Sequence, residues 1–136
     1  MTVKRVFSDA PWEEKVGYCR ALQVGELIFV TGTAPVAEEG GVHAPGDAYE
    51  QAKRCFELIE RALAGLGADL SHVVRTRMFV TDVSRWEEYG RAHHERFAAH
   101  PPTTTMVEVK GLIDPEMLIE IEADAVLPAT PTPTPA

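Results

Sequence analysis

The chain has 136 residues, the length of one domain, with 45% hydrophobic and 25% charged residues, a composition typical of globular proteins. Its net charge of −8 argues against a nucleic-acid partner, because such binding relies on Lys and Arg neutralising phosphates. No apolar run is long enough for a transmembrane helix, and no secretory signal is visible at the N-terminus. We therefore expect a cytoplasmic protein with no membrane association.

The domain is expected to cover residues 1–127 and to be followed by a tail. Residues 128–136 are rich in Pro and Thr, which predicts a disordered end that does not pack. Two cysteines, Cys19 and Cys55, are too few for a disulfide framework. Both are expected to be reduced thiols, and neither has a recognisable activating partner.

The first third of the chain predicts three strands. A short strand is expected near Val3–Phe7, followed by an irregular segment, Ser8–Glu13, and by a longer strand at about Val16–Gln23. The turn signal Gly25-Glu26 separates this second strand from Leu27–Val30, so the second and third strands are expected to form a hairpin.

Two helices are predicted, with a strand between them. Asp47 is expected to cap a helix that runs to about Ala64, where glycines end it. A strand follows at Val73–Thr81. Ser84 and Glu87 then have the spacing of a capping box at the start of a helix that reaches about residue 98.

The last two strands, Pro102–Val109 and Met117–Val126, both alternate apolar and polar residues. The second places Ile and Ala on one face, and its carboxylates on the other, at Glu120, Glu122 and Asp124. Residues 111–116 between the strands contain Gly and Pro, which is typical of the connection in an antiparallel pair. We expect the polar face of these strands to line a site.

This order of elements predicts an α+β two-layer sandwich, with a mixed, mostly antiparallel six-stranded sheet and two helices on one face. The opposite face of such a sheet is neither clearly core nor clearly solvent. Association of identical chains would bury it, so we expect an oligomer.

Several segments resemble the Rid family, also called YjgF or reactive-intermediate deaminases. They are Tyr18 before the hairpin, Val30–Val36 after it, and the motifs Val107–Val109 and Ile119–Ala123, so that the similarity extends to about Val126. The resemblance implies a chorismate-mutase-like fold and a homotrimer with clefts between subunits that bind small carboxylate-bearing metabolites. The family's best-known activity is hydrolysis of 2-imino acids to 2-oxo acids and ammonia, without metal or cofactor.

The resemblance also assigns site residues. The family's site tyrosine matches Tyr18, and its hydroxyl residue and glycine at the hairpin end match Thr31 and Gly32. The glutamate thought to position the attacking water matches Glu120. A site asparagine of the second helix falls at Gly90.

One departure from the family pattern bears on activity. The arginine that holds the substrate carboxylate in the deaminases falls at Thr104, as in the arginine-lacking branches of the family. Losing a charged hydrogen bond is worth roughly 1.5–3 kcal/mol, so imino-acid deaminase activity is doubtful. Arg20, predicted to share a strand face with Tyr18, is a candidate substitute cation. The alternative is that Arg20 is an exposed strand residue or an ion pair at a subunit contact.

Two hypotheses follow for function. In the first, the chain hydrolyses or tautomerises a small imine, enamine or related carbonyl metabolite, with Glu120 handling water or a proton. Tyr18, Thr31 and Thr104 would orient the substrate, and backbone N–H groups of the strand at Thr105 would bind an oxyanion. In the second, the same cleft belongs to a trimeric metabolite-binding or regulatory protein without turnover. Ribonuclease activity conflicts with the charge.

Each assignment has a purely structural alternative. Glu120 has the pattern of a solvated strand face, Tyr18 that of interface packing, and Thr103–Thr105 that of good strand formers. His93 and His94 are adjacent on a helix, point about 100° apart and so do not chelate together. We expect neither a metal site nor a cofactor.

Overall fold

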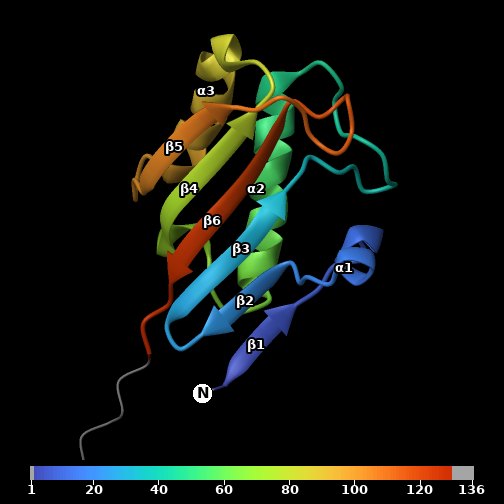
Figure 1. Ribbon diagram of the computed structural model, residues 1–136. Coiled ribbons are helices and arrows are strands. Elements are labelled where there is room, and N and C mark those ends of the chain that lie inside the picture. Colours follow the sequence, from blue (N-terminus) through green and yellow to red (C-terminus); the bar gives the residue numbers. More distant parts are fainter. Residues whose placement is uncertain (1, 130–136) are drawn as a thin grey trace, which may run out of the picture.

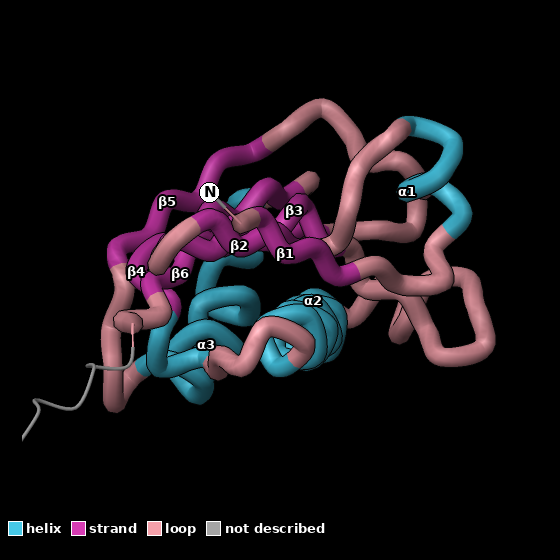
Figure 2. The backbone as a smooth tube through the Cα atoms, turned by 90° about the horizontal axis from the view of Figure 1, so that it is seen from below, coloured by secondary structure: helices cyan, strands magenta, loops and turns pink. Residues whose placement is uncertain are grey.

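The computed structural model describes residues 2–129, and most of the predicted tail lies outside them. The strands are β1 Val3–Val6, β2 Ala21–Val24, β3 Leu27–Thr33, β4 Val73–Val80, β5 Thr103–Glu108 and β6 Ile119–Val126, and the helices are α1 Pro11–Val16, α2 Ala48–Ala64 and α3 Trp86–Phe97. The strands form one sheet in the order β1-β2-β3-β6-β4-β5, in which only β4 and β5 run parallel. Helices α2 and α3 cover one face of it (Figures 1 and 2), which confirms the α+β two-layer sandwich.

The core lies between this sheet and the two long helices. Strand β6 alternates as predicted, with Ile119 and Ile121 fully buried under α2 while the acidic residues between them are partly exposed on the other face. Small residues on α2, among them Ala48, Ala52 and Cys55, are also fully buried. Their size lets the helix backbone lie close to the strands.

Strands β5 and β6 are not neighbours, so the predicted antiparallel pair was wrong. Strand β4 lies between them and pairs with β6 antiparallel and with β5 parallel. The reason is helix α3: a strand, a helix and a second strand make a crossover unit, and such a unit brings its two strands together in parallel. The Gly- and Pro-containing loop then carries the chain past β4 to the centre of the sheet.

The predicted long strand over Val16–Gln23 was also wrong. Residues Pro11–Val16 form the short helix α1, and only Ala21–Val24 are strand. Pro11 has the fixed φ suited to a first helical turn, and Gly17 ends the helix with φ 89°, in the left-handed region. Both signals are in the sequence, but the alternation that follows them resembles a strand.

The two predicted helix starts had different outcomes. Asp47 caps α2 as expected, its carboxylate accepting a hydrogen bond from the backbone N–H of Glu50 at 3.0 Å. Ser84 does not cap α3. It lies in a 3₁₀ turn, Val83–Arg85, that is itself capped by Asp82, and α3 begins directly after that turn.

Candidate functional site

Four of the predicted site residues line one cavity of about 470 Å³ on the open face of the sheet. Tyr18 follows α1, Thr31 and Gly32 come from the end of β3, and Glu120 comes from the start of β6. The remaining wall consists of Phe79, Val109, Gly111, Leu112 and Glu122. Three elements far apart in the sequence thus bring hydroxyl, phenol and carboxylate groups to one place.

Glu120 reaches this cavity because Gly32 has no side chain. The β3–β6 register is irregular between Val30 and Thr33, and Gly32 lies within that irregularity. A Cβ at Gly32 would lie 3.2 Å from both the Cδ and the Oε2 of Glu120, closer than ordinary contact. Glycine at this position therefore lets the carboxylate lie directly against the backbone of β3.

The pKa of Glu120 is raised above its ordinary value. Burial is the main cause, because it disfavours the charged form. The nearby Glu122 raises the pKa further, while the positive charge of Arg20 opposes both effects. A carboxyl group poised in this way can hold or release a proton closer to neutral pH than an exposed glutamate does.

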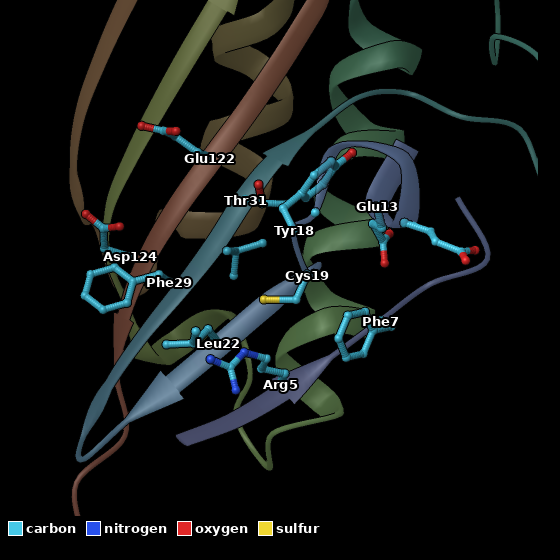
Figure 3. A pocket seen from close by; sticks show the side chains of 13 residues that line it. Arg5, Phe7, Glu13, Tyr18, Cys19, Leu22, Phe29, Thr31, Glu122 and Asp124 are labelled. Carbon is cyan, nitrogen blue, oxygen red and sulfur yellow. The ribbon is translucent and has the colours of Figure 1, made fainter. Parts of the chain in front are cut away.

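Tyr18 is held by the end of α1. Its backbone N–H and that of Gly17 both donate to the carbonyl oxygen of Glu13, at 3.0 and 2.9 Å. Tyr18, Thr31 and Glu122 also line an adjoining hollow of about 780 Å³. Figure 3 shows this hollow, with Tyr18 on one side of it and Glu122 toward β6 on the other.

Arg20 lies behind Tyr18 and does not line the cavity. Its guanidinium carbon is 5.7 Å from the centre of the Tyr18 ring, and its Nη1 donates to the carbonyl oxygen of Gly32 at 3.4 Å. Its Nε is 3.5 Å from the carboxylate of Glu13, and its side chain is 14% exposed. Arg20 thus forms an ion pair within the chain. It lies in an irregular segment and is partly buried, so it is not an exposed strand residue.

Thr104 and Gly90 lie away from the Glu120 cavity in the folded molecule. They line a separate hollow of about 380 Å³ between α3 and β5, on the helix-covered face of the sheet. Thr105 is the next residue on β5, so it faces the opposite side of the sheet from Thr104. Its register partner on β4 is Arg77. Within the described residues, six of the predicted site residues thus line two hollows that share no lining residue, and Thr105 and Arg20 line neither of them.

A hydrogen-bonded group beside this second hollow was not predicted from the sequence. The buried hydroxyl of Thr76 is 2.8 Å from His93 Nε2 and donates to Thr104 Oγ1 at 2.7 Å. A detectable signal was Thr76 itself, a polar residue that alternates with the apolar Met78 and Val80 on one face of β4. Glu13, whose buried carboxylate accepts from the Ser8 N–H at 2.8 Å, was also missed because its segment was predicted to be irregular.

Metal and thiol chemistry find no support in residues 2–129. No cluster of three or more His, Cys, Asp or Glu residues suited to holding a metal ion occurs among them. His93 packs between aromatic rings while His94 is exposed. Both cysteines are free, and burial raises the pKa of the Cys55 thiol well above its usual range. In the same part of the chain, no helix has the length and apolar character to span a membrane.

Comparison with known proteins identifies the family. The sequence model of the family Endoribonuclease L-PSP matches residues 8–127. A crystal structure from Mycobacterium tuberculosis, described as a member of the YjgF/YER057c/UK114 family, is 42% identical, with a TM-score of 0.84 over 93% of this chain and 100% of that one.

Two curated relatives are similar to this chain over most of their length. An uncharacterized protein of Streptomyces coelicolor is 38% identical over 90% of this chain and 91% of its own length. The 3-aminoacrylate deaminase RutC of Acinetobacter baylyi is 30% identical over 79% and 85%, respectively. The chain therefore belongs to the endoribonuclease L-PSP family, the YjgF or Rid family that its strand motifs resemble.

Proposed function

We propose that this chain is a cytoplasmic, cofactor-free hydrolase of small imine or enamine metabolites. The observation that carries the proposal is the cavity in which Glu120, with its raised pKa, lies beside Tyr18 and Thr31. An acid–base group and two hydroxyl donors around one small space are what addition of water to a C=N bond requires.

The chemistry follows from those groups. An enamine first gains a proton on carbon and loses one from nitrogen, which makes it an imine. The Glu120 carboxylate then accepts a proton from water as the water oxygen bonds to the C=N carbon, and the nitrogen gains a proton. The hydroxyl proton of this adduct then moves to the nitrogen as the C=O bond forms and the C–N bond breaks, so that ammonia leaves and one water is consumed for each ammonia formed. Tyr18 and Thr31 orient the substrate.

A relative's name supports the reaction class. The Acinetobacter baylyi protein is named a 3-aminoacrylate deaminase, and 3-aminoacrylate is an enamine. Its identity to this chain, 30% over most of both sequences, makes related chemistry at the matching cavity a reasonable proposal.

The working unit in this proposal is a homotrimer. Glu120 and Tyr18 lie in one hollow of the chain, and Thr104 and Gly90 lie in another on the opposite face of the sheet. Both sets would contact a single small molecule only if the first hollow of one subunit faced the second hollow of another. A closed ring of identical subunits provides this arrangement at every interface.

The threonine at position 104 argues against 2-imino acids as good substrates. No Lys or Arg lines either hollow within the described part of the chain, and Arg20 is already paired with Glu13. A substrate carboxylate would thus lack the two-pronged cation that holds it in the deaminases of the family.

The test follows ammonia release with the trimer and with variants. Imines are formed in situ as 2-iminopropanoate and 2-iminobutanoate, and neutral enamines are supplied directly. Glu120→Gln should lower any acceleration by at least about a hundredfold, the usual contribution of a general base. Glu116→Gln, which changes an exposed loop glutamate, is the matched control. Equal rates with the wild-type chain and Glu120→Gln would contradict the proposal.

The alternative is a metabolite-binding protein without turnover. In its favour, neither the Glu120 cavity nor the Thr104 hollow has Lys or Arg among the described residues that line it, and the lining cation nearby is Arg5 of the adjoining larger hollow. This alternative predicts no acceleration with any imine or enamine, combined with thermal stabilisation by the corresponding oxo compounds. The variant Thr104→Arg gives a second way to distinguish the hydrolase from the binding protein. If that variant gains imino-acid hydrolysis, the catalytic machinery is intact and only carboxylate binding is missing.

A further inference from the structure

Three hydrogen-bonded side chains, here called the relay, end in the second hollow, which is the one lined by Thr104 and Gly90. His93 on α3 contacts the hydroxyl of Thr76 on β4, and Thr76 in turn contacts the hydroxyl of Thr104 on β5. Thr76 and Thr104 are register partners in the parallel β4–β5 pair, which fixes their separation. Thr76 is fully buried, while Thr104, at the outer end of the relay, is exposed.

The surroundings of His93 favour its neutral form. Its ring packs against Phe97 and Phe56, at centroid distances of 4.6 and 5.7 Å, and burial lowers the pKa of the imidazole. The histidine is therefore neutral at pH 7, with one N–H. When that proton is on Nε2, His93 donates to Thr76 and Thr76 donates to Thr104.

Thr104 is then left with its own O–H free to donate. Its oxygen already accepts from Thr76, so its own proton is available to a ligand group in the hollow that Thr104 lines. Hydrogen bonds in series polarise one another, which makes the terminal donor stronger than an isolated threonine hydroxyl. The hollow thus contains a hydroxyl donor without a positive charge.

The rest of the hollow is apolar. Trp86, Met106 and Pro102 line it together with Met78, Phe97 and Pro101, and His94 is the other polar side chain at its edge. Transferring a carboxylate into such a site without a cation is unfavourable, whereas a carbonyl oxygen needs only one donor.

We infer that the His93–Thr76–Thr104 relay binds an uncharged oxygen, so that the substrates of this chain carry a neutral amide, ester or ketone where 2-imino acids carry a carboxylate. The inference rests on the proposed function, because it names the substrate class of the same cleft. It goes beyond it by assigning Thr76 and His93 as positioning residues, which act on the ligand through Thr104.

The experiment compares two probes that differ in this one group. They are 3-aminobut-2-enamide and the 3-aminobut-2-enoate anion, whose hydrolysis releases ammonia. Their oxo counterparts, 3-oxobutanamide and 3-oxobutanoate, measure binding by calorimetry without any reaction. The wild-type chain should bind the amide at least about tenfold more tightly than the anion, because the hollow supplies a donor and no cation.

Three variants locate the effect. Thr104→Val should weaken amide binding by about five- to tenfold, the loss of one hydrogen bond, and leave anion binding unchanged. Thr76→Val should do the same, and the double variant should be no worse than either single one, because the two hydroxyls act in series. The control is Thr103→Val on the same strand as Thr104. It removes a hydroxyl that donates to the carbonyl oxygen of Val74 on β4. Thr104→Arg should reverse the preference toward the anion.

The outcomes separate the inference from the proposed function. Amide binding that depends on Thr104 but is accompanied by no ammonia release would leave the inference standing and overturn the hydrolase. Hydrolysis that prefers the anion, or amide binding unchanged in both Thr104→Val and Thr76→Val, would overturn the inference and leave the hydrolase. If Thr76→Val does not fold, Thr104→Val, at an exposed position, decides by itself.

Discussion

At the scale of single residues, the first hollow depends on a close approach of Glu120 to Gly32. The carboxylate is partly buried, lies against the β3 backbone and has a raised pKa. Its position follows from the absence of a Cβ on Gly32, so the smallest possible side chain at that position should disturb it.

We predict that Gly32→Ala lowers kcat/KM for an enamine substrate by about ten- to a hundredfold. The added methyl would lie 3.2 Å from Glu120, and displacing a reacting group by a fraction of an ångström has effects of this order. The unfolding midpoint serves as the control and should fall by only a few degrees. Unchanged kinetics in a folded variant would show that the position of Glu120 is not critical.

His93 is the second residue whose surroundings set its behaviour. Burial lowers its pKa in the folded chain below the ordinary value of about 6.5. In the unfolded chain it takes up a proton at that ordinary value, while the folded chain resists protonation. The free energy of unfolding should therefore fall as the pH drops through about 6.5, and the loss should end below the folded pKa.

We predict that His93→Gln removes this component of the pH dependence. Chemical denaturation at pH 7.5 and pH 5.5 should show a smaller difference in the variant than in the wild-type chain, by at most about 1.4 kcal/mol, because pH 5.5 lies only about one unit below the unfolded pKa. His94→Gln, one residue along the helix and exposed, is the matched control and should keep the wild-type difference. Identical pH dependence in all three proteins would contradict the assignment.

At the scale of elements, helix α1 is short and depends on one buried carboxylate. Glu13 accepts hydrogen bonds from both the backbone N–H and the hydroxyl of Ser8, and its other neighbour is Arg20. Its backbone carbonyl also receives the N–H of Tyr18. A helix of six residues has little stability of its own, so these contacts hold Tyr18 in place.

We predict that Glu13→Ala destabilises the segment around α1 by on the order of 3 kcal/mol, because it leaves Arg20 without its partner. Amide hydrogen exchange at Gly17 and Tyr18 should accelerate, while exchange in α2 should change little. Glu14→Ala, at the next and exposed position, is the control. Protection at Tyr18 that survives in Glu13→Ala would show that α1 is held by other contacts.

At the scale of the whole molecule, the open face of the sheet is apolar in several places. Phe29 is 45% exposed and Phe7 is 65% exposed, and both line the larger hollow on that face (Figure 3). Exposed aromatic residues around a concave surface are typical of a face that associates with another protein surface. The split of the site into two hollows points to the same conclusion, with identical chains as the partners.

We predict that the chain has three times its 14.9 kDa mass in solution by light scattering. Phe29→Asp places a second carboxylate beside Asp124, its register partner, on the face that the trimer would bury. This variant should dissociate the trimer and abolish turnover together, because each cleft needs two subunits. A monomeric wild-type chain that still hydrolyses its substrate would contradict the composite site.

The sequence by itself determined the two-layer sandwich, the alternating faces of β6 and the family. These depend on short-range periodicity and on local motifs such as Ile119–Ala123, which are visible without coordinates. The prediction failed at α1, where a proline–glycine helix signal competed with alternation, and at the β5–β6 pair, where adjacency in sequence was mistaken for adjacency in the sheet.

Only the tertiary structure decided which polar residues meet. Placing β4 beside β5 brings Thr76 next to Thr104, and α3 then adds His93 to the pair, while Glu120 lies on the opposite face of the sheet. Thr76 is 17 positions from His93 and 28 from Thr104 along the chain, so no local pattern links it to either residue. Strand order and helix packing set such distances, and they result from burial of the whole core rather than from any one segment.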